Sequence, residues 1–207
     1  MIRWILVDYG EVISAPLSHD TIADLAELAE LEADDFLYRY WRFRRDYDLG
    51  QTPIGYWSAV VDRDLTNEIA LVDRLTRIDV RGWLHLNSGT LNVLESVAQR
   101  ARTQIALLSN APEPLAAAID GCPWSRVLAR SFYSCRLGRA KPEPMAFTSS
   151  LAQLNADPAE VLFIDDRPEN TAAAATLGLA AITFTSAANL ESEIDLISAG
   201  RGSVSGR

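Results

Sequence analysis

Short runs of consecutive apolar residues alternate along this chain with longer stretches in which apolar residues recur at helical spacing. The first run, Trp4-Ile5-Leu6-Val7, is followed by Asp8 and Gly10. Such a run is typical of a strand that is buried on both faces of a parallel sheet. Ligands bind outside the carboxyl ends of such strands, so Asp8 is a candidate nucleophile or metal ligand. The alternative is an aspartate that only caps a turn.

Two comparable apolar runs occur in the second half of the chain. One covers residues 105–108, directly after Gln104, and is followed by Ser109, and the other covers residues 161–164 and is followed by Asp165 and Asp166. Each therefore predicts a buried strand that ends in polar side chains.

The segments around these runs complete an alternation of strands and helices. Shorter strands are expected near residues 130–133 and 181–184, and helices near residues 94–101 and after Pro112 and Pro168, because proline suits the first helical turn. Such alternation implies right-handed crossovers between parallel strands. We therefore predict an α/β fold, a Rossmann-like parallel sheet with helices on both faces.

Residues 17–87 interrupt this alternation with a helical pattern. Apolar residues recur three and four positions apart in about four successive segments, and Pro53 with the glycines around it marks a connection between helices. We expect a core domain of residues 1–16 and 88–197 and an inserted helical domain of residues 17–87. Residues 198–207 are rich in glycine, serine and arginine, and are expected to be a disordered tail.

An arginine-rich and aromatic segment, residues 38–47, lies within the helical insert. Its four arginines are interleaved with five aromatic residues. One interpretation is an amphipathic helix that packs its aromatic side and exposes its arginines to water. The other is that one or two of the arginines, with Arg42 and Arg45 as candidates, bind an anionic substrate.

Composition and charge exclude several classes of partner. A hydrophobic share of 48% and a charged share of 23% are ordinary for a globular protein, and the net charge of −9 disfavours nucleic acid. No run is long enough to span a membrane, and the opening run is too short for a signal peptide. Cys122 and Cys135 match no metal-ligand spacing and are too few for a disulfide framework, so a cytoplasmic location is expected.

The polar ends of the three buried strands are expected to converge. Asp8, Ser109 and the pair Asp165 and Asp166 share one context, a strand end at one edge of the sheet, and Lys141 precedes the start of a helix. Helices that begin there direct backbone amides and the positive end of their dipoles toward this edge. This arrangement favours a bound phosphate.

A count of charges at this edge predicts a cation. Asp8, Asp165 and Asp166 face one lysine, and two like charges about 4 Å apart repel by roughly 4 kcal/mol at an effective dielectric constant near 20. A phosphate dianion could not enter such a site unaided. Oxygen ligands favour Mg²⁺, which commonly binds one or two carboxylates together with a substrate phosphate.

Taken in order, these stretches resemble the four motifs of the haloacid dehalogenase superfamily. The helical insert between the first and second motifs is similar to that of the branch that carries an α-helical cap. The resemblance covers nearly the whole chain before the tail, and it rests on all four motifs together. It implies a magnesium-dependent phosphatase for a small phosphorylated metabolite, such as a sugar phosphate.

The resemblance also implies a role for each acidic residue. Asp8 would be the nucleophile and a ligand of Mg²⁺, and Gly10 would offer its backbone carbonyl to the metal. Asp166 would be the direct acidic ligand, with Asp165 as a further ligand or as a partner of metal-bound water.

The remaining motif residues would bind the phosphate. Ser109 would contact a phosphate oxygen with help from the backbone of Asn110, and Lys141 would pair with both the nucleophile and the phosphate. Asn170 would support the acidic residues. In-line attack by Asp8 would give an aspartyl phosphate, which water then hydrolyses.

Gly10 departs from the usual phosphatase pattern. The family commonly has a second aspartate at this position, which serves as general acid and base. Its loss typically costs a factor of roughly 10²–10⁴ in rate. We therefore expect a substrate whose leaving group needs little protonation, such as a sugar 1-phosphate or an acyl phosphate, or else a water molecule in the missing role. Glu11 is the nearest spare carboxylate.

Two alternatives stay open at this point. A haloacid dehalogenase proper would use Asp8 against carbon without a metal, but Asp165 and Asp166 would repel its carboxylate substrate. The second is a catalytically weak relative that binds a phosphorylated metabolite or a partner protein. Gly10 supports it, whereas Asp8, Lys141 and Asp166 count against it. The loop of residues 9–14 is a candidate hinge or flap, and the protein is expected to be a monomer or a homodimer.

Overall fold

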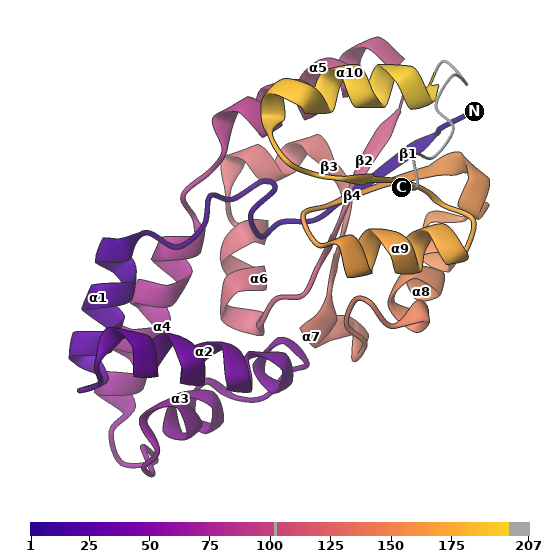
Figure 1. Cartoon of the computed structure of the whole chain (residues 1–207). Coiled ribbons are helices and arrows are strands. Elements are labelled where there is room, and N and C mark those ends of the chain that lie inside the picture. The colour runs from indigo at the N-terminus through magenta and orange to yellow at the C-terminus, as the bar shows by residue number, and fades with distance from the viewer. Residues whose placement is uncertain (102, 199–207) are drawn as a thin grey trace.

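A five-stranded parallel sheet forms the centre of the computed structural model, which describes residues 1–101 and 103–198. The strand order is β3-β2-β1-β4-β5 (Figure 1), and each strand overlaps its expected range. The predicted Rossmann-like α/β fold is therefore confirmed. The strands are β1 (Trp4–Val7), β2 (Gln104–Ser109), β3 (Leu128–Tyr133), β4 (Val161–Asp165) and β5 (Ala180–Thr183).

The register of β1 fixes where the polar strand ends meet. β1 lies between β2 and β4, and Val7 pairs with Leu107 on one side and with Ile164 on the other. The backbone N–H of Asp8 continues this ladder by donating to the carbonyl of Ile164 at 2.8 Å. The carboxyl ends of β1, β2 and β4 therefore lie at the same edge of the sheet.

Helices cover both faces of the sheet because the side chains of each buried strand alternate between them. Ile5 and Val7 pack with α5 (Ser88–Ala101), α6 (Glu113–Asp120) and α10 (Ala187–Ser198). Trp4 and Leu6 pack on the other face with α8 (Pro144–Leu154) and α9 (Pro168–Thr176). This two-sided burial explains why β1 is apolar throughout.

Four helices form a separate group with its own apolar core, which we call the helical group. They are α1 (His19–Leu28), α2 (Ala33–Asp48), α3 (Pro53–Val61) and α4 (Ile69–Trp83), and their buried residues include Phe36, Tyr40, Trp57 and Leu75. Figure 1 shows this group at one end of the molecule, away from α5 and α10. Local signals start two of its helices: the hydroxyls of Ser18 and Thr52 cap α1 and α3.

Two paired segments connect the helical group to the sheet. Ser14 and Leu86 form an isolated antiparallel bridge. On either side of it, the N–H of Ala15 donates to His85 at 2.7 Å and the N–H of Asn87 donates to Ile13 at 2.8 Å. The chain thus enters and leaves the helical group at one place.

Short helical turns complete the fold: η1 (Pro123–Val127), α7 (Ser134–Leu137) and η2 (Pro158–Glu160). The helix that the sequence placed directly after Lys141 begins later, at Pro144, because a turn precedes it. The expected tail lies outside the described residues, apart from Ser198 at the end of α10. Among the described residues, no helix has the length and apolarity needed to span a bilayer.

Candidate active site

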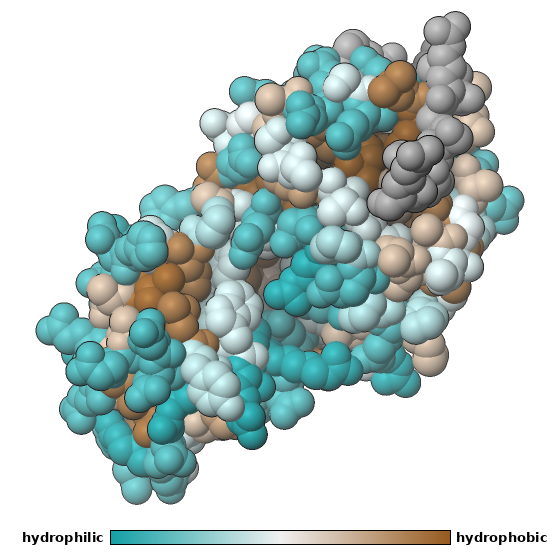
Figure 2. Space-filling view, viewed as in Figure 1, coloured by the Kyte–Doolittle hydropathy of each residue, from teal (hydrophilic) through white to brown (hydrophobic). Residues whose placement is uncertain are grey.

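A cavity of about 400 Å³ lies between the carboxyl edge of the sheet and the helical group. Its walls come from the loops after β1, β2 and β4, from the segment around Lys141, and from α2 and α4. In the space-filling view, hydrophilic residues follow the boundary between the two halves of the molecule (Figure 2). Nine of the residues singled out in the sequence line this cavity: Asp8, Gly10, Glu11, Arg45, Ser109, Asn110, Lys141, Asp166 and Asn170.

Lys141, the only lysine of the chain, lies between two carboxylates. Its Nζ is 2.7 Å from Oδ1 of Asp8 and 2.7 Å from Oδ2 of Asp165. The ammonium lies 5.6 Å from the ring centre of Phe163, and the side chain is nearly fully buried. A compact ammonium suits this position because it can bridge two acids that come from neighbouring strands.

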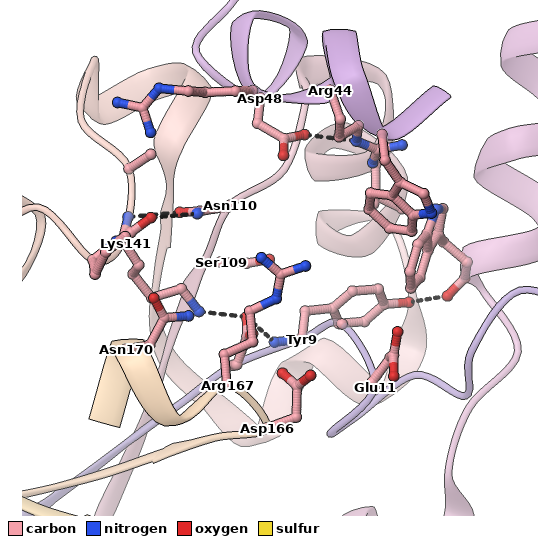
Figure 3. A pocket seen from close by; sticks show the side chains of 18 residues that line it. Tyr9, Glu11, Arg44, Asp48, Ser109, Asn110, Lys141, Asp166, Arg167 and Asn170 are labelled. Carbon is pink, nitrogen blue, oxygen red and sulfur yellow. Dashed lines mark hydrogen bonds and ion pairs between the residues drawn. The ribbon is translucent and has the colours of Figure 1, made fainter. Parts of the chain in front are cut away.

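Asp165 uses both of its oxygens within the protein. Oδ2 accepts from Lys141, while Oδ1 accepts from the backbone N–H of Arg167 and from Nδ2 of Asn170, each at 2.9 Å. Asp166 is half-buried and lines the cavity, where Figure 3 shows its carboxylate. The two adjacent acids are therefore not equivalent, because only one of them borders the open space.

The acidic side chains lie close enough to share a cation. One carboxylate oxygen from each of Asp8, Asp165 and Asp166 lies within 4.8 Å of the others. An all-oxygen donor set of this charge fits a hard cation such as Mg²⁺. Because Asp165 is engaged by three donors, Asp8 and Asp166 are the carboxylates best placed to bind one.

The electrostatics of the site follow from burial and crowding. Burial raises the pKa of Asp8, Lys141 opposes this shift, and Asp165 and Asp166 add to it. Burial and the charges of Asp165 and Glu11 also raise the pKa of Asp166. Burial alone would lower the pKa of Lys141, but Asp8 and Asp165 outweigh it and raise that pKa. The site thus favours a permanently charged ammonium and an additional positive charge.

The loop after β2 is joined to the lysine by the side chain of Asn110. Its Nδ2 donates to the carbonyl of Lys141 and its Oδ1 accepts from the N–H of Lys141, both at 2.9 Å. Ser109 is buried beside it at the cavity wall. The sequence had assigned a role only to the backbone of Asn110, so this clamp is a structural finding.

Gly10 lies in the turn that follows β1. The N–H groups of Ile13 and Ser14 donate to the carbonyl of Tyr9 at 2.9 and 2.8 Å. A Cβ atom at Gly10 would meet Cζ3 of Trp83 at 3.8 Å, which is an ordinary contact distance. The turn therefore has space for a Cβ atom at this position.

On the helical side of the cavity, the two candidate arginines lie in different surroundings. Arg45 lines it and pairs with Glu143 at 2.6 Å, whereas Arg42 is not among the described lining residues and contacts Tyr38 on an exposed surface. Arg44, which was not singled out as a binding residue, is buried and lines the cavity. Other lining residues to which the sequence gave no role include Trp41, Asp48, Trp83 and Arg167.

Arg44 belongs to a buried polar network. Its Nε is 2.8 Å from Oδ1 of Asp48, and its Nη1 lies 3.4 Å from Oδ2 of Asp79 and also contacts the hydroxyl of Tyr40. That hydroxyl donates to Asp79 at 2.6 Å and accepts from Nε1 of Trp83 at 2.9 Å. The i,i+4 spacing of Tyr40, Arg44 and Asp48 on α2 is the sequence signal that could have identified the network.

A family model and a curated protein match parts of this chain. A family model described as haloacid dehalogenase-like hydrolase matches residues 6–178. Flavin mononucleotide hydrolase 1 of Arabidopsis thaliana chloroplasts is 33% identical over 75 residues, which are 36% of this chain and 31% of that protein. The match thus spans less than a third of that relative.

Solved structures resemble nearly the whole chain. A haloacid dehalogenase family enzyme from Bacteroides thetaiotaomicron, in complex with magnesium and inorganic phosphate, has a TM-score of 0.71 and 19% identity over 90% of this chain and 96% of its own. A haloacid dehalogenase-like hydrolase from Porphyromonas gingivalis has a TM-score of 0.72 and 20% identity over 96% of this chain and 98% of its own. These likenesses show a common fold.

Proposed function

Because the chain belongs to the haloacid dehalogenase-like hydrolase family, we propose that it is a magnesium-dependent phosphatase that acts on a small phosphorylated metabolite. The observation that carries this proposal is the position of Lys141 between Asp8 and Asp165, with Asp166 beside them at the cavity. This arrangement offers a nucleophile, an anchor for a phosphate and an acidic site for a cation.

Asp8, Asp166 and the backbone carbonyl of Gly10 would hold Mg²⁺. Asp165 would orient Lys141 and the loop before α9, since its oxygens already accept three hydrogen bonds. When bound, the cation would supply positive charge that lets a phosphate dianion approach three carboxylates. The Bacteroides enzyme of the same fold, crystallised with magnesium and phosphate, supports this assignment.

The side chains of this chain would perform the transfer. Oδ1 of Asp8 is held by Lys141 and by the N–H of Tyr9, which leaves Oδ2 as the attacking atom. Ser109 and Lys141 would bind the phosphoryl oxygens, and the N-terminus of α6 would add its positive dipole end. In-line attack would form an aspartyl phosphate on Asp8, and water would then release inorganic phosphate.

We further propose that residues 17–87 act as a cap over the site. Arg45 is the candidate for a cap residue that reaches the substrate, because it lines the cavity and its ion pair with Glu143 is largely exposed. Arg44 is less suited to this role, since Asp48, Asp79 and Tyr40 already engage it. A sugar phosphate is the proposed substrate class. The name of the flavin mononucleotide hydrolase likewise gives a small phosphate ester as its substrate.

The cytoplasm is the proposed location. Cys122 and Cys135 are both free thiols in the structure, which fits a reducing compartment. The relative from a chloroplast shows that a related protein works in another compartment.

An activity screen tests the proposed function. Purified protein is incubated with phosphorylated sugars, nucleotides and organic acids, with magnesium or with a chelator, beside an Asp8→Asn variant. We expect phosphate release that requires both magnesium and Asp8. Phosphate release by the variant would contradict the mechanism, and chloride release from 2-haloacids in the presence of the chelator would favour a dehalogenase instead.

A further inference from the structure

Gly10 stands where the family commonly has an aspartate that acts as general acid and base. The cavity has another buried carboxylate, that of Asp48. Asp48 lies at the C-terminal end of α2 and lines the cavity. Among the described residues that line the cavity, Asp48 is the only carboxylate from the helical group. Figure 3 shows it across the cavity from Asp166, with Ser109 between them.

The charges around Asp48 do not balance. Arg44 is shared by two carboxylates, Asp48 at 2.8 Å and Asp79 at 3.4 Å. Asp79 is almost fully buried and also accepts from the hydroxyl of Tyr40 at 2.6 Å. One guanidinium therefore faces two carboxylates. A proton on Asp48 would make the net charge of Arg44, Asp48 and Asp79 zero.

Asp48 is chemically suited to exchange that proton with a ligand. Arg44 engages its Oδ1, whereas its Oδ2 has no hydrogen-bond partner among the described residues. Burial raises the pKa of Asp48 to about 6 against the opposing effect of Arg44. The other groups that act on it are Tyr47 on α2, Tyr56 on α3, Asp79 on α4 and Arg167 from the loop after β4.

A serine fixes Asp48 relative to the loop that would bind the phosphate. The Oγ of Ser134 accepts from the N–H of Ala111 at 3.0 Å and donates to the backbone carbonyl of Asp48. Ala111 follows Ser109 and Asn110 directly, so the end of α2 is joined to that loop through one side chain. This contact holds Asp48 on the side of the cavity opposite the sheet.

In-line phosphoryl transfer to Asp8 needs an acid on the side of the cavity where Asp48 lies. When Asp8 attacks phosphorus, the leaving oxygen lies on the opposite side of the phosphoryl group, toward the helical group. We propose that Asp48 is the catalytic residue that protonates this oxygen, in place of the acid that Gly10 lacks. The inference rests on the proposed phosphatase function.

The proton balance closes over two steps. In the first, the bond from Asp8 to phosphorus forms, the bond to the leaving oxygen breaks, and the Asp48 proton moves to that oxygen. In the second, water attacks phosphorus, the bond to Asp8 breaks, and a proton of the water moves to the Asp48 carboxylate. The enzyme then returns to its starting state.

The test compares two esters in an Asp48→Asn variant. A hexose 6-phosphate needs its leaving group protonated, whereas p-nitrophenyl phosphate releases a stable anion. We expect kcat/KM to fall by about 100-fold or more for the sugar ester and by less than about tenfold for the aryl ester. Asp46→Asn, an exposed substitution on the same helix, should change neither value.

Three results would overturn the inference. They are an equal loss on both esters in a folded Asp48→Asn protein, no loss on either, and the ester-specific loss appearing in Glu11→Gln instead. If the wild-type protein with magnesium hydrolyses neither ester, the proposed function itself fails, which is a distinguishable outcome.

The wild-type protein provides a second measurement that does not depend on the folding of a variant. An acid must be protonated to act, so kcat/KM for the sugar ester should decrease as the pH rises above about 6. The aryl ester should lack this decrease. Parallel pH profiles for the two esters would contradict the role of Asp48.

Discussion

Asn110 and Lys141 are joined by two reciprocal hydrogen bonds of 2.9 Å between one side chain and one peptide unit. This clamp connects the loop after β2 to the residue that bridges Asp8 and Asp165. The groups that would bind the phosphate are therefore positioned together, although they are far apart in the sequence.

Removing the clamp should affect both stability and activity. In Asn110→Ala, the backbone N–H and carbonyl of Lys141 lose their partner, so we expect the free energy of unfolding to fall by about 1–3 kcal/mol. A displaced lysine should lower kcat/KM by roughly 10–100-fold. Urea unfolding and steady-state kinetics measure the two effects. Asn67→Ala, in an exposed turn, should change neither, and equal effects of the two variants would contradict the role of the clamp.

Replacing the only lysine should make the site depend more strongly on a cation. Lys141→Met leaves buried Asp8 and Asp165 without their shared counterion, so the free energy of unfolding should fall by about 3–5 kcal/mol. Magnesium should then recover more of the melting temperature in the variant than in the wild type, because it supplies the missing positive charge. Equal stabilisation by magnesium in both proteins would show that the cation does not bind at these acids.

Two neighbouring arginines of α2 should respond very differently to the same substitution. Arg44→Met leaves Asp48 and Asp79 unpaired in a buried network and should cost about 3–5 kcal/mol of unfolding free energy. Arg42→Met removes an exposed contact with Tyr38 and should cost less than about 0.5 kcal/mol. Urea unfolding of the two variants tests this contrast. Similar losses would mean that the network contributes little.

An aspartate introduced at Gly10 should compensate for the loss of the proposed acid, Asp48. A Cβ atom fits at Gly10, since it would meet Trp83 at 3.8 Å, an ordinary contact distance. In an Asp48→Asn background, Gly10→Asp should raise kcat/KM for a hexose 6-phosphate by about tenfold or more. In the wild-type background the gain should be smaller, because Asp48 already supplies a proton. No gain in either background would mean that proton transfer does not limit the reaction.

The sequence was sufficient to predict the sheet and the convergence of its polar ends. β1 and β4 are apolar runs because both of their faces are buried, and this burial is what made Asp8 and Asp165 recognisable at their ends. The motif around Lys141 was also recognisable, although a turn separates this residue from the start of α8.

The helical side of the site could not be predicted in the same way. Arg42, Arg44 and Arg45 are close in sequence, yet they lie on an exposed surface, in a buried network and at the cavity. Their directions depend on how α2 packs against α4, where Asp79 and Trp83 contact the network. The i,i+4 spacing can indicate a network within α2, but it does not encode the packing of α2 against α4, so the sequence alone could not separate Arg42, which contacts Tyr38, from Arg45 at the cavity.

The most direct test of the central claim is to look for the covalent phosphate on Asp8. Protein that is incubated with magnesium and a phosphate ester is quenched in acid, digested and analysed by mass spectrometry. We predict a phosphorylated peptide that contains Asp8 and that is absent from Asp8→Asn protein or when magnesium is chelated. Phosphate release with no modified Asp8 peptide, or a phosphate found on another residue, would contradict the account.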